Sequence, residues 1–271
     1  MMDTKGYIPN AGQTHIPFRG NILVPFLPTE GPVYPDPPLP EPVLKPEFIE
    51  RGIRVKEMSQ HFLPGVTPEM IDWFWANMEK GYYLWAPGAH KRFNWVRSPG
   101  QYGFLESAHM ISEIHVPGGA VFGGDGVMIQ RMPLSWFPFT THMEHVILEG
   151  IFTENGEMFD CTIHMWEETE GGANHITAAI ENTRNPQLPD FVKELQAAEP
   201  PAPCPELGNG LAHSEYEAAM WPVFLPRLYD LWKDHPDPAQ NVPCDLRVRE
   251  LADGSLEYIA ENGPVKIPRN R

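Results

Sequence analysis

The spacing of apolar residues predicts two helices. One begins at Thr67, a residue type that caps helix N-termini, and its apolar side chains follow at the i, i+3, i+4 and i+7 positions of a buried face up to an expected end at Gly81. A second apolar stripe lies in the helix that carries His213 and reaches Trp232. The two prolines inside this stripe should kink or restart the helix, because each lacks a backbone N–H.

Between the two helices, apolar and polar residues alternate with the period of two that is typical of strands. Residues 82–95 mix aromatics with proline and glycine, which predicts a loop or a short second helix. The strands are predicted over residues 108–116, 127–132, 142–152, 158–167 and 175–182. Antiparallel strands followed by a long C-terminal helix indicate an α+β fold, in which a curved sheet wrapped around the helix leaves a cavity between them.

Proline dominates the first 60 residues. Each proline fixes its own φ and disfavours helix in the residue before it, so residues 1–60 are predicted to form an extended arm and residues 61–271 the folded domain. The apolar run from Ile22 to Leu27 is too hydrophobic for a free tail. We therefore expect the arm to pack on a surface, across a homodimer.

Charge and composition narrow the class of partner. The chain has 271 residues, 42% of them hydrophobic, and a formal net charge of −16. An acidic surface repels nucleic-acid phosphates and anionic lipids, so neither is an expected partner. Three cysteines without a C-x-x-C spacing, no apolar leader and no long apolar run predict a cytoplasmic protein with reduced thiols.

His213 and Glu217 are the most informative pair in the chain. They lie one helical turn apart, so their side chains project from one face of the C-terminal helix. An imidazole and a carboxylate on one face can bind one Zn²⁺ while other segments supply the remaining ligands. The same spacing is common on solvated helix surfaces, so the pair depends on support from elsewhere in the chain.

The strand over 108–116 places unusual side chains on one face. His109, Glu113 and His115 alternate with residues of the opposite face. Glu113 is the preferred carboxylate ligand, because a buried charge must be paired or bound to metal. Glu106 is the alternative, and the whole face could instead be solvated.

Two further histidines are candidates for chemistry. His90 follows a Pro-Gly turn beside aromatic residues, where an irregular backbone can direct a side chain into a cavity. His164 stands alone on the strand over 158–167 and suits general acid/base catalysis, since the unperturbed imidazole pKa is about 6.5. The alternatives are a loop histidine bonded to backbone and a strand histidine facing water.

Over residues 65–235 the chain resembles the zinc-dependent C–C hydrolases that act on acylated phloroglucinols, the family of diacetylphloroglucinol hydrolase and phloretin hydrolase. The residues that carry the resemblance are Tyr82, Trp85-x-Pro87-x-x-His90, Trp95, Glu113 before Gly118-Gly119, and His213-x-x-x-Glu217.

The resemblance implies a Bet v 1-like helix-grip fold and a specific site. Its metal ligands are expected to be His90, Glu113, His213 and Glu217, holding Zn²⁺. Tyr82 and His164 are expected to be catalytic, with Tyr82, Trp85 and Asn94 in contact with substrate. Asn94 stands one place later than the family pattern requires, and a second substrate tyrosine has no counterpart in Ile176-Thr177-Ala178-Ala179.

The implied activity is hydrolysis of the C–C bond between an acyl group and a phloroglucinol-type ring, with a small aromatic ketone as substrate. One alternative is a non-catalytic helix-grip protein that binds a hydrophobic small molecule. Another is a zinc hydrolase or decarboxylase of a different aromatic polyketide. The chain lacks the glycine-rich nucleotide motifs and the G-x-S-x-G motif of serine hydrolases.

Overall fold

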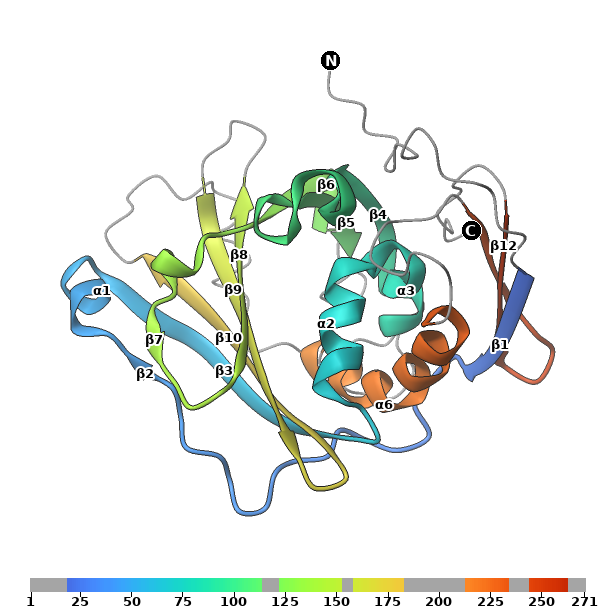
Figure 1. Ribbon diagram of the computed structural model, residues 1–271, viewed down its shortest axis with the longest axis horizontal. Helices are drawn as coiled ribbons and strands as arrows, with labels where there is room; N and C mark the ends of the chain where they lie inside the picture. The colour runs from blue at the N-terminus through green and yellow to red at the C-terminus, as the bar shows by residue number, and fades with distance from the viewer. Residues whose placement is uncertain (1–18, 114–121, 153–157, 183–212, 234–243, 263–271) are drawn as a thin grey trace.

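A curved antiparallel sheet forms the body of the protein (Figure 1). The computed structural model describes residues 19–113, 122–152, 158–182, 213–233 and 244–262. Seven strands lie in the order β3-β10-β9-β8-β6-β5-β4. Their bounds are β3 Ile53–Pro64, β4 His90–Arg97, β5 Ala108–Glu113, β6 Phe122–Arg131, β8 His145–Phe152, β9 Met158–Thr169 and β10 Gly172–Asn182. Most neighbours in the sheet follow one another in the chain, whereas β3 pairs with β10 and so joins the first strand to the last.

Three helices lie inside the curve of the sheet (Figure 1). They are α2 (Pro68–Ala76), α3 (Met78–Trp85) and α6 (His213–Trp232). Thr67 caps α2 as predicted, since its hydroxyl accepts a hydrogen bond from the Met70 N–H. α6 packs against α2, α3 and β3, and it continues through Pro222 and Pro226. This arrangement of an antiparallel sheet around a long C-terminal helix confirms the predicted α+β helix-grip fold class.

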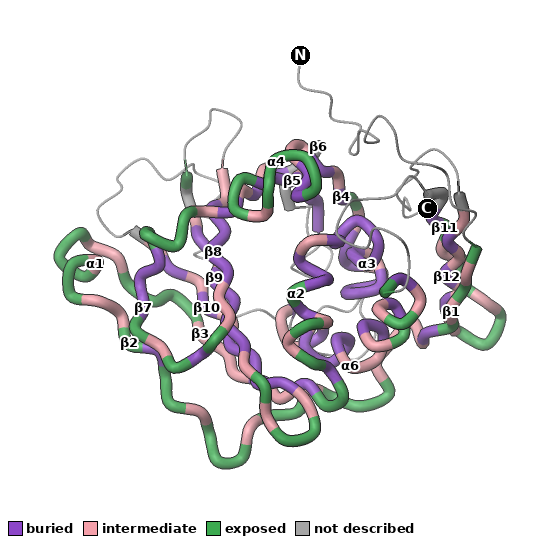
Figure 2. The backbone as a smooth tube through the Cα atoms, in the orientation of Figure 1, coloured by how far each residue is buried: buried purple, intermediate pink, exposed green. Residues whose placement is uncertain are grey.

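The two faces of the sheet bury different side chains, and Figure 2 shows runs of buried residues along β8 and β9. On the inner face, aromatic rings of α2, α3 and α6 form one core with inward residues such as Ile147 and Trp166. On the outer face, Ile163 and Ile176 pack in a second core with Phe139 and with Leu44 of the arm. The histidines of these two strands, His164 on β9 and His175 on β10, point inward, towards Trp75 of α2 and Trp221 of α6.

The proline-rich arm lies against its own chain. β1 (Arg19–Pro25) pairs with β12 (Ser255–Asn262), which pairs with β11 (Cys244–Glu250) in a separate three-stranded sheet. The Leu23 carbonyl accepts a hydrogen bond from Arg227, and the Phe26 carbonyl accepts one from Tyr216, so α6 anchors the arm. Further along, β2 (Val43–Leu44) pairs with β7 (Phe139–Thr140).

The position where the arm was expected to end, residue 60, lies within β3, a strand that the sequence pattern did not reveal.

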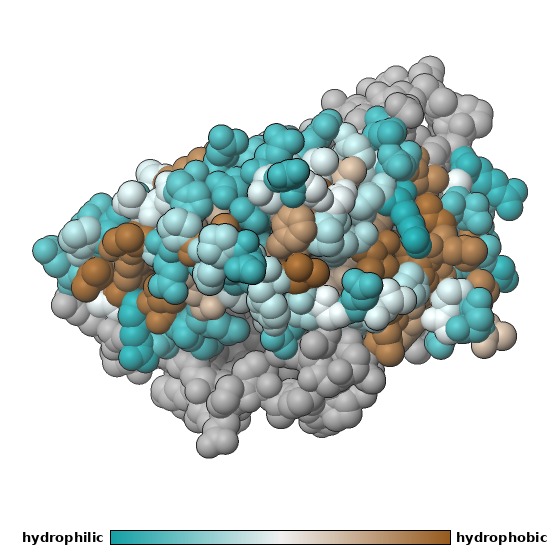
Figure 3. Space-filling view, turned by 90° about the horizontal axis from the view of Figure 1, so that it is seen from below, coloured by the Kyte–Doolittle hydropathy of each residue, from teal (hydrophilic) through white to brown (hydrophobic). Residues whose placement is uncertain are grey.

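Hydrophobic side chains gather on the face shown in Figure 3, at the end of the molecule that holds β1. Leu23 of β1 is 52% exposed. Contact with a second subunit stays a prediction.

The shorter elements are α1 (Pro46–Glu50), α4 (Pro99–Tyr102) and the 3-10 turns Phe104–Glu106 and Leu134–Trp136. Among the helices of the described residues, none has the length and apolar character needed to cross a membrane. Predicted structure over 114–116 and 183–212 lies outside the described residues.

The expected helix end at Gly81 is wrong, and the reason is packing. Gly81 lies within α3, where a Cβ would be 2.5 Å from Leu228 of α6 and 2.9 Å from Phe74 of α2. The missing side chain thus permits close contact of three helices, although glycine is a poor helix former.

We expect Gly81→Ala to destabilise the protein by about 1–3 kcal/mol, the usual cost of overpacking a core. Chemical denaturation measures this change. Gly31→Ala is the control, because a Cβ at Gly31 meets nothing within 4 Å. Equal stability of the two variants would show that α3 and α6 are less tightly packed than the structure indicates.

Candidate metal centre

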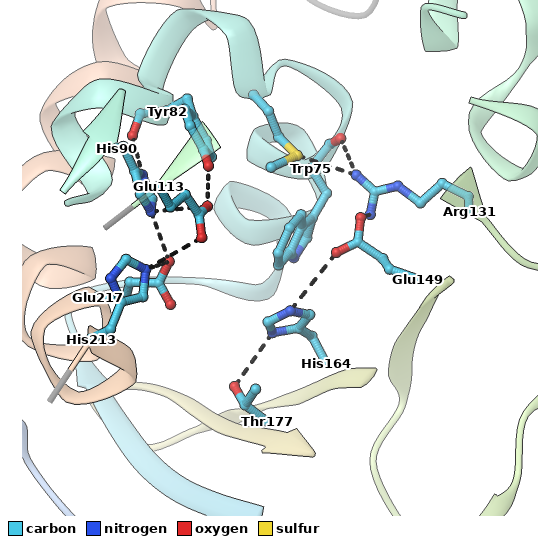
Figure 4. A network of polar contacts seen from close by, with 11 residues as sticks. Trp75, Tyr82, His90, Glu113, Arg131, Glu149, His164, Thr177, His213 and Glu217 are labelled. Carbon is cyan, nitrogen blue, oxygen red and sulfur yellow. Dashed lines mark hydrogen bonds and ion pairs between the residues drawn. The ribbon is translucent and has the colours of Figure 1, made fainter. Parts of the chain in front are cut away.

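Four side chains from three distant segments converge between the sheet and α6 (Figure 4). His90 Nε2 lies 3.1 Å from Glu217 Oε1 and 3.5 Å from Glu113 Oε1. His213 Nε2 lies 3.4 Å from Glu217 Oε1 and 3.7 Å from Glu113 Oε2. The two imidazoles and two carboxylates therefore face a common point.

Local structure explains how each residue arrives there. His90 is the first residue of β4 and Glu113 the last of β5, and the antiparallel register places them directly opposite each other. A register shift after His90 lets both His90 and Phe93 turn inward. His213 and Glu217 occupy the first turns of α6, so the predicted common face of this pair is what aims them at the sheet.

A second layer of contacts fixes the His90 imidazole. Its Nδ1 lies 2.7 Å from the Tyr82 carbonyl oxygen, and its ring stacks on the Tyr82 ring at 4.0 Å with an interplanar angle of 8°. A carbonyl can only accept, so Nδ1 carries a proton and donates it to Tyr82, and Nε2 is the atom that would bind a metal. This carbonyl–imidazole pairing is common behind metal-bound histidines. The Tyr82 hydroxyl donates to Glu113 Oε1.

The charges of the site are strongly interdependent. Burial alone would raise the pKa of Glu217, but the charge of His213 and hydrogen bonds from His213 and His90 outweigh it and lower this pKa to about 2. Burial, followed by the charge and hydrogen bond of Glu113, raises the pKa of Tyr82 well above its usual value. Glu217 is thus an anion and Tyr82 a neutral phenol at physiological pH.

These residues fit a zinc ion. Ligand atoms of His90, His213 and Glu217 lie within 4.8 Å of one another, and Glu113 closes the fourth side. Two imidazoles and two carboxylates are a donor set that Zn²⁺ accepts in tetrahedral sites. Glu106, the alternative to Glu113, is exposed on a 3-10 turn, so the structure favours Glu113.

His164 belongs to a second polar group on the inner face (Figure 4). It is buried rather than facing water, with the Trp75 ring 4.6 Å away between centroids. Its Nε2 lies 4.0 Å from Glu149 Oε2, and its Nδ1 lies 3.4 Å from the Thr177 hydroxyl. Burial lowers the pKa of His164 to about 4, Glu217 opposes this shift, and Arg131 adds to it.

Two further residues, Trp85 and Asn94, were expected to contact the substrate. Trp85 packs edge-on to His90 at 5.3 Å between centroids, within the aromatic core. Asn94 alternates with the inward residues Phe93 and Trp95 on β4, so it points away from the metal cluster, and its contact with substrate stays a prediction. His115 and Gly118-Gly119 lie outside the described residues.

Sequence reasoning missed several buried polar residues of the inner face. They are Arg131 on β6, Glu149 on β8, His61 on β3 and His175 on β10. A glutamate within the apolar run Val-Ile-Leu-Glu-Gly-Ile-Phe was an available signal, since charge in such a strand needs a partner. His61 and His175 stand opposite each other in the β3–β10 register, which the sequence did not show.

The buried histidines predict a pH-dependent stability. Burial lowers the pKa of His164 to about 4, and it also lowers the pKa values of His61 and His175. Below about pH 6.5 these imidazoles bind protons in the unfolded chain but stay neutral in the folded chain. The free energy of unfolding is therefore highest above about pH 6.5 and falls as the pH is lowered towards 4. For His164 alone the loss is about 3 kcal/mol.

Urea denaturation of metal-free protein across this range tests the prediction. The matched variant His164→Phe should show a shallower dependence, which separates His164 from carboxylates that titrate nearby. Identical pH dependence in both proteins would mean that His164 is not buried in neutral form.

The sequence matches no protein-family model, and no curated protein is similar to it. Among solved structures, the chain is similar to a point mutant of norcoclaurine synthase from Thalictrum flavum, at 11% identity over 71% of this chain and 98% of that chain, with a TM-score of 0.37. It is also similar to Ara h 8.0201, at 13% identity over 53% of this chain and 87% of that chain, with a TM-score of 0.34. Protein Ms6760 from Mycobacterium smegmatis is similar at 10% identity over 64% of this chain and 99% of that chain, with a TM-score of 0.34.

Proposed function

We propose that this protein is a zinc-dependent hydrolase that cleaves the C–C bond between an acyl group and a phloroglucinol-type ring. The observation that supports the proposal most is the convergence of His90, Glu113, His213 and Glu217 on one point between sheet and helix. These four residues would hold the metal. Bound zinc supplies a Lewis acid and a water of lowered pKa.

In the proposed reaction the bond between the acyl carbon and the ring carbon breaks. Water is divided between the two products. Its hydroxyl adds to the acyl carbon, so the acyl group is released as a carboxylic acid, and a proton adds to the ring carbon, so the ring is released with a hydrogen in place of the acyl group. A phloroglucinol ring permits this step because its keto tautomer makes the ring a leaving group stabilised as an enolate. The proton must come from a group near the ring, and a neutral donor must hold the oxygen that becomes negative.

His164 and Tyr82 are the residues proposed for these two roles. His164 is buried on the inner face of the sheet, where an imidazole can exchange a proton out of contact with bulk water. Tyr82 remains a neutral phenol because burial and Glu113 raise its pKa, so it retains its O–H as a donor. That O–H donates to Glu113 in the structure, and in the proposed complex it would turn to a substrate oxygen.

An aromatic wall beside the metal ligands supports an aromatic substrate. Trp85 lies 5.5 Å from Trp75 and 5.2 Å from Trp221 between ring centroids, and all three are buried. Such rings offer faces and edges to a flat ligand, although they also stabilise the core by themselves. We propose a small aromatic ketone as the ligand on this basis.

The direct test is to incubate zinc-loaded protein with phloretin and with mono- and diacetylphloroglucinol, and to identify the free ring and the acid by mass spectrometry. Release of both products in equal amounts supports the proposal. Intact substrates after prolonged incubation with zinc-loaded protein would reject this substrate class, and another aromatic polyketide would then need to be tested.

A non-catalytic helix-grip protein that binds a hydrophobic small molecule is the second candidate. The aromatic inner core favours it, because this function needs the same fold and no metal. Metal content separates the two: a purified protein with about one Zn²⁺ per chain, bound through the four ligands, favours the enzyme.

A further inference from the structure

Arg131 and Glu149 form a buried ion pair next to His164. Arg131 on β6 and Glu149 on β8 stand opposite each other in the sheet register, and their side chains are 1% and 6% exposed. Arg131 Nη1 lies 2.9 Å from Glu149 Oε1. Arg131 Nη2 also donates to the Trp75 carbonyl at 3.0 Å and lies 3.3 Å from Met78 Sδ. The Arg131 guanidinium thus links the Glu149 carboxylate of β8 to the Trp75 carbonyl of α2.

The pair has a feature that stability alone does not require. Two apolar residues of similar volume often stabilise a core as well as a buried ion pair does, because both charges lose their hydration. Arg131 engages one carboxylate oxygen of Glu149, and the other oxygen, Oε2, is directed at His164 Nε2 at 4.0 Å (Figure 4). That separation is an ion-pair distance, longer than a hydrogen bond.

The His164 imidazole is held from its other sides as well. Thr177 lies 3.4 Å from Nδ1, and the Trp75 ring packs on the imidazole at 4.6 Å between centroids. With its hydroxyl donating to Nδ1, Thr177 would leave the proton on Nε2, towards Glu149. A carboxylate opposite an N–H both orients the ring and stabilises the imidazolium that forms when the ring takes up a second proton, as the aspartate does in Ser-His-Asp triads.

We propose that Glu149, held by Arg131, is a positioning residue that orients the His164 imidazole and stabilises its protonated form. The inference rests on the proposed function, because it gives the proton-transferring histidine its partner. Burial raises the pKa of Glu149, and the charges of Glu113 and Glu217 add to this rise, whereas the charge of Arg131 opposes it and favours the anionic form that this role requires.

Steady-state kinetics of the zinc-loaded full chain test the role in turnover. Glu149→Gln should lower kcat by about 10- to 100-fold, part of the 10²–10⁴-fold that a positioned acid/base contributes, with KM within about twofold and zinc content unchanged. Glu149→Asp should recover part of the lost kcat, since it restores the charge. The control is Glu79→Gln, which breaks an equally buried pair with Lys80 and should lower stability without lowering kcat.

Because breaking a buried pair can prevent folding, the double variant Arg131→Met/Glu149→Gln removes both charges together. It should fold and show the same loss of kcat. If either folded variant keeps the wild-type kcat while only its melting temperature falls, the ion pair is structural and the proposal is overturned.

Imidazole ¹⁵N NMR at neutral pH tests the pairing without any substrate. The signals of His164 are assigned by their loss in His164→Gln. Wild-type protein should show one tautomer, protonated on Nε2, and Glu149→Gln should shift it towards a mixture. Unchanged His164 nitrogen shifts would overturn the pairing. If wild-type protein cleaves no acylphloroglucinol but the shifts respond, the proposed substrate class fails while the role of Glu149 stands.

Discussion

Replacing His213 or Glu217 by alanine is expected to strip most of the zinc from the protein and to abolish cleavage, while leaving a folded chain. Each side chain is one of four that face the common point, and Glu217 lies within 3.4 Å of both imidazoles. A metal that binds only the folded state stabilises it by about 2.7 kcal/mol when free zinc exceeds the dissociation constant a hundredfold. Both variants should lose this zinc-dependent stabilisation.

Elemental analysis and thermal denaturation with and without added zinc measure the effect. Glu215→Ala is the matched control, because it lies in the same turn of α6 but its carboxylate accepts a hydrogen bond from Tyr34 instead of facing the cluster. The control should keep its zinc. Full zinc occupancy in His213→Ala and Glu217→Ala would contradict the proposed centre.

His164→Ala is expected to lower turnover by about 10²–10⁴-fold while keeping its zinc, since a positioned acid/base contributes on that scale. The zinc should stay because His164 is no member of the four-residue cluster. Tyr82→Phe should lose less activity, because it removes one hydrogen bond to the developing negative charge and keeps the ring that stacks on His90.

Kinetics with the better of phloretin and an acetylphloroglucinol, together with zinc analysis of each variant, check this expectation. His145→Ala serves as the control, since His145 is partly exposed at the start of β8 and contacts Asp72. Near-normal turnover by His164→Ala would remove this residue from the mechanism. His109, which is also buried and stacks on Phe93, would then be the next histidine to test.

Local patterns in the sequence were sufficient for several features of the fold. Thr67 caps α2, and the runs of alternating residues became β5, β6, β8, β9 and β10 with ends shifted by a few positions. β3 and β4 escaped detection because register shifts interrupt the alternation, one in the pairing of β3 with β10 and two in β4, and because β4 begins just after the Pro87-Gly88 turn. The role of Gly81 could not be predicted because it depends on a contact with Leu228 of α6, a residue far away in the sequence.

In the metal centre, too, some features follow from local sequence and others only from tertiary packing. The one-turn spacing of His213 and Glu217 is a property of any α-helix, so the sequence alone determined that the two side chains share a face. His90 stands opposite Glu113, and Glu149 faces His164 while held by Arg131. Both arrangements depend on strand register and on the curvature of a sheet in which β3 pairs with β10. Only the tertiary structure decided these contacts, because residues far apart in the chain meet through packing, which no short sequence window contains.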